Sequence, residues 1–129
     1  MDGTSPQLSI VIVSYNTADL TLACLQSVRE QTRRVEYEVI VVDNNSSDDS
    51  ADRIAREHPW VTLIRSTENL GFAGANNEGV SRSSGQYVLL LNPDTVVLDH
   101  AIDMLVEFAR RCPDAGIWGG RTLFEDRSL

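Results

Sequence analysis

Residues Leu8 to Val13 read Leu-Ser-Ile-Val-Ile-Val, and the polar run Ser14-Tyr15-Asn16-Thr17 follows at once. An almost continuous β-branched run of this length is typical of a strand that is buried on both faces. Val39 to Val42 repeats the arrangement and is ended by the polar run Asp43-Asn44-Asn45-Ser46-Ser47. Buried strands with polar tips predict a parallel sheet whose tips gather at one edge.

Helical patterns alternate with these strands along the chain. Thr17 is the expected cap of a helix that runs from Leu20 to about Gln31. Further helices are expected from Asp48 to Glu57 and over Ile102 to Ala109, the latter capped by Asp99. Further strands are expected at Val61 to Arg65, at Gln86 to Leu91 and from Gly116 to Gly119. This alternation predicts an α/β fold with a Rossmann-like, mostly parallel sheet flanked by helices on both faces.

The length and composition fit one domain. The chain has 129 residues, 42% of them hydrophobic, and we expect a tail at residues 1–7 and a domain at residues 8–129. No apolar run approaches the roughly 20 residues of a membrane span. Residues 1–7 lack a cationic, apolar leader, and two distant cysteines, with Cys24 expected to be buried, suggest no disulfide framework. We therefore expect a cytoplasmic protein, which can also lie at the inner face of the membrane.

The charge balance limits the classes of ligand. Eleven arginines, with no lysine, stand against 19 acidic residues, which gives a net charge of -8. Nucleic-acid binding relies on a cationic surface and is therefore not expected. An anionic ligand such as a phosphate would need a metal ion, a helix N-terminus or a few arginines. His58 and His100 fit no metal or triad spacing, and we predict that both lie on the surface.

Two carboxylates follow expected strands directly. Asp43 at a strand tip is suited to accept hydrogen bonds from an imide N–H or a ribose hydroxyl, although a local Asx turn explains it equally well. Asp94, in Asn92-Pro93-Asp94, is suited with the Asn92 amide to hold a magnesium ion that a diphosphate completes, although a Pro-Asp turn is the simpler reading. We expect these two acids at neighbouring strand tips.

Four ordered blocks of the sequence resemble the N-terminal half of family 2 glycosyltransferases with the GT-A fold. The blocks are Leu8 to Asn16, Val41 to Ser50, Asn69 to Gly79 and Tyr87 to Asp94. The third, Asn-Leu-Gly-Phe-Ala-Gly-Ala-Asn-Asn-Glu-Gly, is read from the sequence as a Gly- and Asn-rich loop, and its spacing matches neither a Walker loop nor a dinucleotide fingerprint. The Asn-Pro-Asp and Asn-Leu-Gly-Phe sequences look most like the rhamnosyltransferase-like branch.

The resemblance implies roles for individual positions. It implies an inverting, metal-assisted transfer of a sugar from a UDP- or dTDP-linked donor to a glycan or lipid-linked acceptor, as in polysaccharide and cell-wall synthesis. Asp94 would be the metal ligand, for Mg²⁺ or Mn²⁺. The nucleotide-binding residues would be Ser14, Tyr15, Asn16, Asp43, Asn45, Gly71, Asn76 and Asn92.

This sequence departs from the family pattern at three points. Asn92 replaces the first acid of the metal motif, and Asn76 replaces an arginine. No residue matches the catalytic base, which we expect beyond residue 129, so the domain is expected to be truncated and the isolated chain inactive. These departures leave a noncatalytic nucleotide-binding or interaction module as the alternative. A nucleotidyltransferase ranks last, because Ser14 to Thr17 has neither glycine nor lysine.

Overall fold

A parallel sheet forms the centre of the computed structural model, which describes residues 5–129. The described strands are β1 (Leu8–Ser14), β2 (Tyr37–Asp43), β3 (Thr62–Arg65) and β4 (Tyr87–Leu90). Their order in the sheet is β3-β2-β1-β4, and all three pairings are parallel. The expected α/β fold is therefore confirmed.

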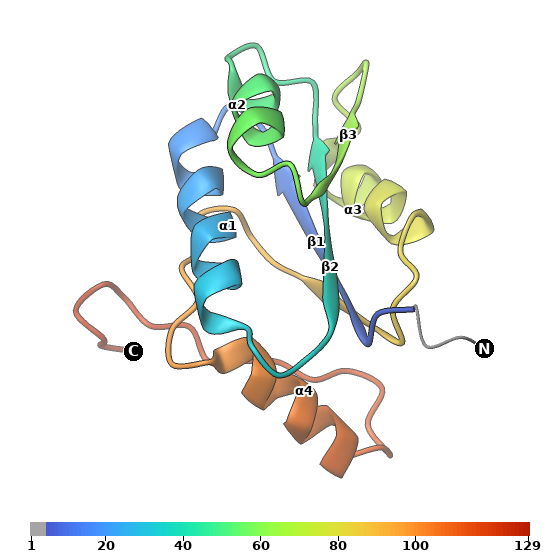
Figure 1. Ribbon diagram of the computed structural model, residues 1–129, viewed down its shortest axis with the longest axis vertical. Coiled ribbons are helices and arrows are strands. Elements are labelled where there is room, and N and C mark those ends of the chain that lie inside the picture. The colour runs from blue at the N-terminus through green and yellow to red at the C-terminus, as the bar shows by residue number, and fades with distance from the viewer. Residues whose placement is uncertain (1–4) are drawn as a thin grey trace.

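Helices cover both faces of this sheet. They are α1 (Ala18–Gln31), α2 (Ser50–Glu57), α3 (Gly71–Ser81) and α4 (Ala101–Arg111). Figure 1 shows α1 and α2 together on one side of β1 and β2, α3 on the other side, and α4 below α1. Each strand-to-strand connection within β1–β2–β3–β4 contains a helix, as parallel crossovers require.

Alternate side chains of β1 supply two cores. Leu8, Ile10 and Ile12 are buried in the larger core with α1, α2 and α4. Val13 faces the smaller core with Val42 and Ala75 of α3. This two-sided burial explains why the strand has no polar alternation.

The connection from β3 to β4 differs from the expectation. The Gly- and Asn-rich stretch is not a loop, because α3 begins at Gly71. A Cβ at Gly79 would lie 2.4 Å from Val11 Cγ1, so a residue without a side chain lets the helix approach β1 closely. Gly79, which weakens the helical signal in the sequence, therefore serves helix–sheet packing.

Smaller expectations also fail. Gly116 to Gly119 form no strand, and α4 begins after His100 rather than at a cap made by Asp99. α2 begins at Ser50, two residues later than expected. His58, expected on the surface, is buried just after α2, and its Nδ1 accepts a hydrogen bond from Trp60 Nε1 at 3.2 Å. The sequence around His58 does not reveal that Trp60 will be its hydrogen-bond partner.

Residues 1–4 of the expected tail lie outside the described residues. Gln7, the last residue of that tail, is held at the start of the sheet: its amide donates to Glu36 O at 2.8 Å, and its carbonyl accepts from Tyr87 N at 3.0 Å. Within residues 5–129, no helix has both the length and the apolar character that a membrane crossing needs.

Asp103 joins α4 to the turn before β2. Its carboxylate is buried and accepts the backbone N–H groups of Arg33, Arg34 and Val35 at 2.9, 3.0 and 3.0 Å. Burial acts to raise the pKa of Asp103, but the three amide donors and the charge of Arg34 outweigh it, and the pKa is lowered.

We predict that Asp103→Ala destabilises the chain by about 2–4 kcal/mol, because three amides lose their acceptor. A lowered folded pKa means that the contribution of Asp103 is present above its unfolded pKa of about 3.9 and is lost as the pH falls through the folded value. Urea unfolding from pH 7 to pH 2 should therefore show a shallower loss of stability in the variant. If the free energy of unfolding fell equally with pH in the variant and the wild type, Asp103 would not have this role.

Candidate functional site

A cleft of about 500 Å³ opens at the carboxyl edge of the sheet. Tyr15 and Thr17 contribute to it from the loop after β1, Asn44 from the tip of β2, and Asn92, Pro93 and Asp94 from the loop after β4. Val13, Leu20 of α1, and Asn69 and Phe72 at the start of α3 complete the lining. We call this the edge cleft. Its walls are largely apolar, with polar groups at the strand tips.

The strand order explains why the cleft forms here. From β1 the chain proceeds to β2 and β3 on one side, and then returns to place β4 on the other side of β1. α1, which follows β1, packs on one face of the sheet, and α3, which leads into β4, packs on the other face, so the cleft opens where the strand order reverses. Open α/β sheets bind their ligands at such a switch point.

Asp43 ends β2 next to the edge cleft. The side chain is 4% exposed, and Oδ2 accepts the Ser46 amide at 3.1 Å. Oδ1 is buried and has no hydrogen-bond partner among the residues that the structure describes. A buried carboxylate oxygen without a donor is costly, so a ligand that brings an N–H or O–H to it would remove that cost.

Asn44 is a functional position that the sequence analysis missed. Its Oδ1 accepts Leu70 N at 2.8 Å, and its Nδ2 donates to Asn69 Oδ1 and to the Gly71 carbonyl, both at 3.2 Å. Asn44 thereby fixes the start of α3 against the tip of β2, where both line the edge cleft. The signal in the sequence is its position directly after Asp43, in the polar run that ends the strand.

Asp94 and Asn92 lie on the opposite side of the cleft. Both are exposed to solvent and line the cleft. Thr95 Oγ1 donates to Asn92 O at 2.7 Å, and Val97 N donates to the Ser27 hydroxyl of α1 at 2.9 Å. The loop that presents Asp94 is thus held by its own turn and by α1.

Cys24 supports the same loop from beneath. It is fully buried, as expected, with Sγ 3.8 Å from Asn92 O and 3.9 Å from Thr95 Oγ1. Burial, together with the nearby negative charge of Asp94, raises the pKa of Cys24 to about 11, although the Thr95 hydrogen bond lowers it. The thiol is therefore neutral at physiological pH and acts as a packing residue.

The two acids do not sit at neighbouring strand tips, and that expectation is wrong. Asp43 belongs to β2 and Asp94 follows β4, with β1 between them. Two strand spacings separate these strands by about 10 Å. The two carboxylates therefore do not form one binding point: Asp94 lines the cleft, and Asp43 lies at the tip of β2 directly before Asn44, which also lines it.

The remaining predicted positions lie in different settings. Tyr15 lines the cleft with a ring that is 48% exposed. Ser14 is fully buried, and its hydroxyl bonds to Thr21 Oγ1 at 3.0 Å, within the fold. Asn45 is exposed with φ 65°, and Gly71 adopts φ 73° at the start of α3. Asn76 is buried on α3. Asn16 is engaged by the loop after β2, as described below.

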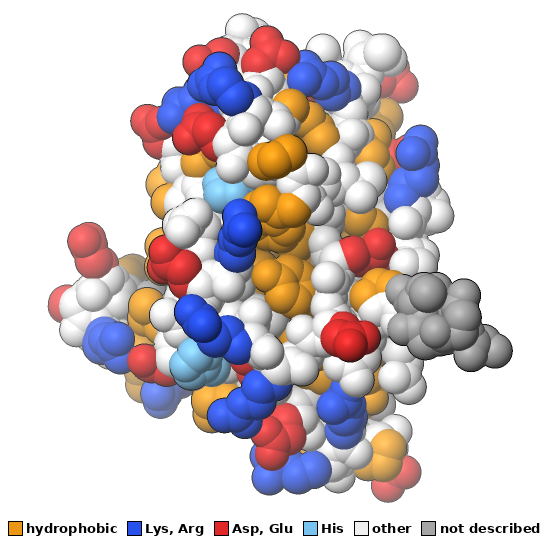
Figure 2. Space-filling view, viewed as in Figure 1, with side chains coloured by type: hydrophobic (Ala, Val, Ile, Leu, Met, Phe, Trp, Pro, Cys, Tyr) orange, Lys and Arg blue, Asp and Glu red, His pale blue; other side chains and the backbone are white. Residues whose placement is uncertain are grey.

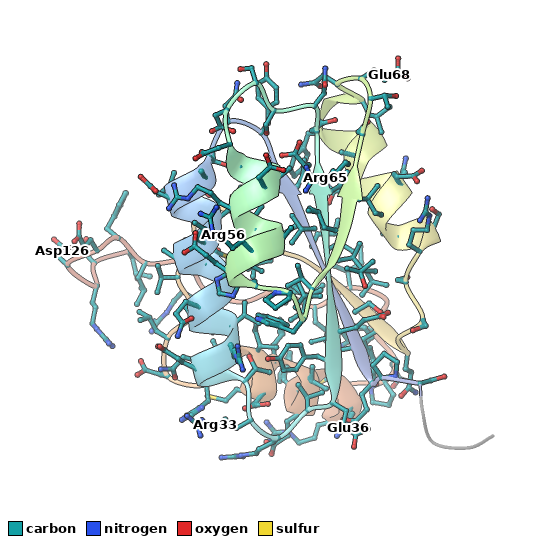
Figure 3. All side chains as sticks on the ribbon, turned by 45° about the horizontal axis from the view of Figure 1, so that its top comes forward. Arg33, Glu36, Arg56, Arg65, Glu68 and Asp126 are labelled. Atoms are coloured by element: carbon teal, nitrogen blue, oxygen red, sulfur yellow. The ribbon has the colours of Figure 1, made fainter. Side chains whose placement is uncertain are left out.

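The charge of the cleft is negative. Among residues 5–129, no arginine lines it, and Asp94 is its one carboxylate. Arg65 is paired with Asp52 at 2.8 Å and Arg82 with Glu78 at 3.3 Å. Figure 3 shows Arg65 on β3, between α2 and α3, and Figure 2 shows both signs of charge mixed over α2. An anion in the cleft would therefore meet no cationic side chain.

The donor set of the cleft fits a hard divalent cation. No group of three His, Cys, Asp or Glu side chains suited to a metal occurs in the described part of the chain. One carboxylate and one amide oxygen, from Asp94 and Asn92, leave most positions to water and ligand oxygens. Mg²⁺ and Mn²⁺ accept that arrangement, whereas structural zinc requires four protein ligands.

These features define a ligand-binding α/β domain, and comparison with known proteins places it more narrowly. The model of the family "Glycosyl transferase family 2" matches residues 9–128. The chain therefore belongs to glycosyl transferase family 2.

Several relatives share this segment. The chain is 33% identical over 109 residues to the poly(ribitol-phosphate) beta-glucosyltransferase of Bacillus spizizenii, a match that covers 81% of this chain and 17% of that protein. It is 35% identical over 99 residues to the glycosyltransferase AglE of Haloferax volcanii, covering 73% and 32%. The chain thus spans less than two thirds of the length of these relatives.

Two solved structures share the fold. The mannosyltransferase PcManGT of Pyrobaculum calidifontis, in complex with GDP-Man and Mn²⁺, has a TM-score of 0.69 and 29% identity over 81% of this chain and 31% of that one. TarS of S. aureus has a TM-score of 0.73 and 19% identity over 92% and 40%. The GT-A fold predicted from the sequence is confirmed.

We predict that Asn44→Ala lowers the free energy of unfolding by about 2–4 kcal/mol, because the Leu70 amide loses its acceptor in a buried setting. Asn45→Gly is the matched control: it removes the adjacent, exposed side chain while keeping the left-handed backbone, so a change within about 0.5 kcal/mol is expected. Urea denaturation of both variants measures this. Equal stabilities for the two variants would refute the role of Asn44.

Proposed function

We propose that this chain is the donor-binding part of an inverting glycosyltransferase that uses a nucleoside diphosphate sugar, UDP- or dTDP-linked, and a divalent metal. One observation carries the proposal: the exposed carboxylate of Asp94 and the side chain of Asn44 both line the edge cleft, and Asn44 directly follows Asp43, a buried carboxylate with a free oxygen at the tip of β2.

The Asp43 side of the cleft is suited to the nucleoside. Uracil, thymine and guanine each present a ring N–H, and ribose presents hydroxyls, so each offers a donor for the unpaired Oδ1. The exposed ring of Tyr15 offers a face on which a base can stack. Asn45 directly follows Asn44, and the Gly71 carbonyl accepts a hydrogen bond from Asn44 Nδ2, which supports a role for both in binding the nucleoside.

The Asp94 side is suited to the diphosphate. With no arginine in the cleft, a metal held by Asp94, with Asn92 as a second oxygen donor, would balance the charge of a diphosphate. When bound, the metal would stabilise the diphosphate as a leaving group. The metal in the GDP-Man complex of PcManGT supports this assignment.

The reaction would be a single displacement at C1 of the donor sugar. The oxygen of an acceptor hydroxyl would form the new bond to C1 while the bond to the diphosphate oxygen breaks, and a carboxylate base would accept the hydroxyl proton. None of the described residues occupies that role. Asp126, whose pKa is lowered by hydrogen bonds from Ser128, lies on the C-terminal segment at one side of the molecule (Figure 3). We propose that the base lies beyond residue 129.

The donor sugar, the acceptor and its location are proposed from the sequence blocks and from the relatives. Asn92-Pro93-Asp94 and the Asn69 to Phe72 sequence support a rhamnosyltransferase-like donor sugar. The name of the poly(ribitol-phosphate) beta-glucosyltransferase of Bacillus spizizenii supports a glycan or lipid-linked acceptor. For its location we propose the cytoplasmic face of the membrane. A noncatalytic nucleotide-binding module is the second candidate, favoured by Asn92, by Asn76 and by the lack of a base among the described residues.

Calorimetric titration with UDP, dTDP and GDP, with and without Mn²⁺ or Mg²⁺, tests the proposal. We expect binding that strengthens at least tenfold with metal. A folded chain that binds none of the three would refute the donor site. Sugar transfer by this chain alone would exclude the noncatalytic alternative and contradict a base beyond residue 129.

We predict that Asp94→Asn abolishes the strengthening by metal and leaves the melting temperature within about 2 °C, because the side chain is exposed and makes no ion pair with any of residues 5–129. Asp114→Asn is the matched control, since Asp114 also follows a proline and is exposed but lies outside the cleft lining. A sharp fall in melting temperature with unchanged nucleotide affinity would make Asp94 a structural turn residue.

A further inference from the structure

We infer that Asn16 is a positioning residue, which joins the loops after β1 and β2 and thereby sets the geometry of Asp43. This inference rests on the proposed function, because the consequence is selectivity for the base of the donor. It also changes the role predicted for Asn16 from the sequence, which was direct contact with the nucleotide.

Two hydrogen bonds in opposite directions form the junction. The backbone amide of Asn16 donates to Ser46 Oγ at 2.9 Å, and the side-chain oxygen of Asn16 accepts the Ser47 amide at 2.8 Å. The Ser47 hydroxyl also reaches that oxygen at 3.3 Å. We call Asn16, Ser46 and Ser47 the loop clasp. It connects positions that are some 30 residues apart in the sequence.

The loop clasp acts on Asp43 through one further bond. The amide of Ser46 donates to Asp43 Oδ2 at 3.1 Å, so a residue held by Asn16 in turn holds one oxygen of the carboxylate. This bond fixes the rotation of the carboxyl group and leaves Oδ1 as the oxygen without a partner. Opening the clasp would allow the loop, and with it Asp43, to rotate.

The conformation of Asn16 explains why this residue type is used. Its φ of 51° lies in the left-handed region, which glycine, asparagine and aspartate adopt most readily. Of these, asparagine and aspartate carry an oxygen at the position that accepts the Ser47 amide. Asn16→Gly therefore removes the side-chain bond without backbone strain, whereas Asn16→Asp keeps the acceptor.

The test compares UDP with CDP, which differ at the base edge: uracil carries a ring N–H where cytosine carries a bare ring nitrogen. The ratio of the two affinities reports whether a carboxylate faces that edge. We expect Asn16→Gly to reduce the ratio roughly tenfold, the effect of about 1.4 kcal/mol, and Asn16→Asp to restore it. The added negative charge of Asn16→Asp disfavours an anionic ligand, so recovery cannot come from electrostatic attraction.

A double-mutant cycle separates positioning from direct contact. In an Asp43→Asn background the ratio should already be low, and Asn16→Gly should not change it further. Ser46→Ala removes the hydroxyl that accepts the Asn16 amide and so opens the clasp from the other loop. It should also lower the ratio of UDP to CDP affinity, and it replaces Asn16→Gly as the test if that variant does not fold.

Three results would overturn the inference. Equal weakening of UDP and CDP would show a general structural role. An effect of Asn16→Gly that persists in the Asp43→Asn background would show direct contact with the nucleotide. A folded wild-type chain that binds neither UDP, dTDP nor GDP would instead overturn the proposed function, and the role of Asn16 with it.

Discussion

The parallel pairing of β1 with a strand on each side is the constraint from which the site follows. β1 pairs with β2 over seven residues, from Leu8 opposite Tyr37 to Ser14 opposite Asp43, and with β4 on its other edge. Because all three strands run the same way, their following loops emerge at one edge. That edge holds Tyr15, Asn44 and Asp94, which are far apart in sequence. The chemistry of the cleft therefore depends on the register of β1.

The same constraint separates the two acids. Asp43 and Asp94 leave the sheet on opposite sides of β1, about two strand spacings apart. A ligand that engages both must be elongated, with a hydrogen-bond donor at one end and an anionic group that shares a metal at the other. A nucleoside diphosphate has this form. The net charge of -8 agrees with this reading, because a divalent cation supplies the positive charge that the cleft lining lacks.

Features that depend on periodicity were predictable from the sequence. The buried strands β1 and β2 follow from β-branched runs that polar residues end, such as Leu8 to Val13, and helix α1 follows from apolar residues at helical spacing after Thr17. Features that depend on a distant partner were not. Gly79 lowers the helical signal of α3, yet its lack of a side chain is what fits the helix against Val11. The sequence predicts Asn16 to be a loop residue near a ligand. The structure shows that its side-chain oxygen accepts a hydrogen bond from the Ser47 amide.

The central claim is that a nucleotide crosses the tip of β1, with its base beside Asp43 and its diphosphate beside Asp94. A crystal structure of the chain with UDP and Mn²⁺ tests this most directly, since the anomalous signal of manganese locates the metal independently of the nucleotide. The account predicts manganese bound to Asp94 and the uracil ring N–H on Asp43 Oδ1. Manganese bound at another acid, or a base lying beyond β4 with Asp43 still unpaired, would contradict it.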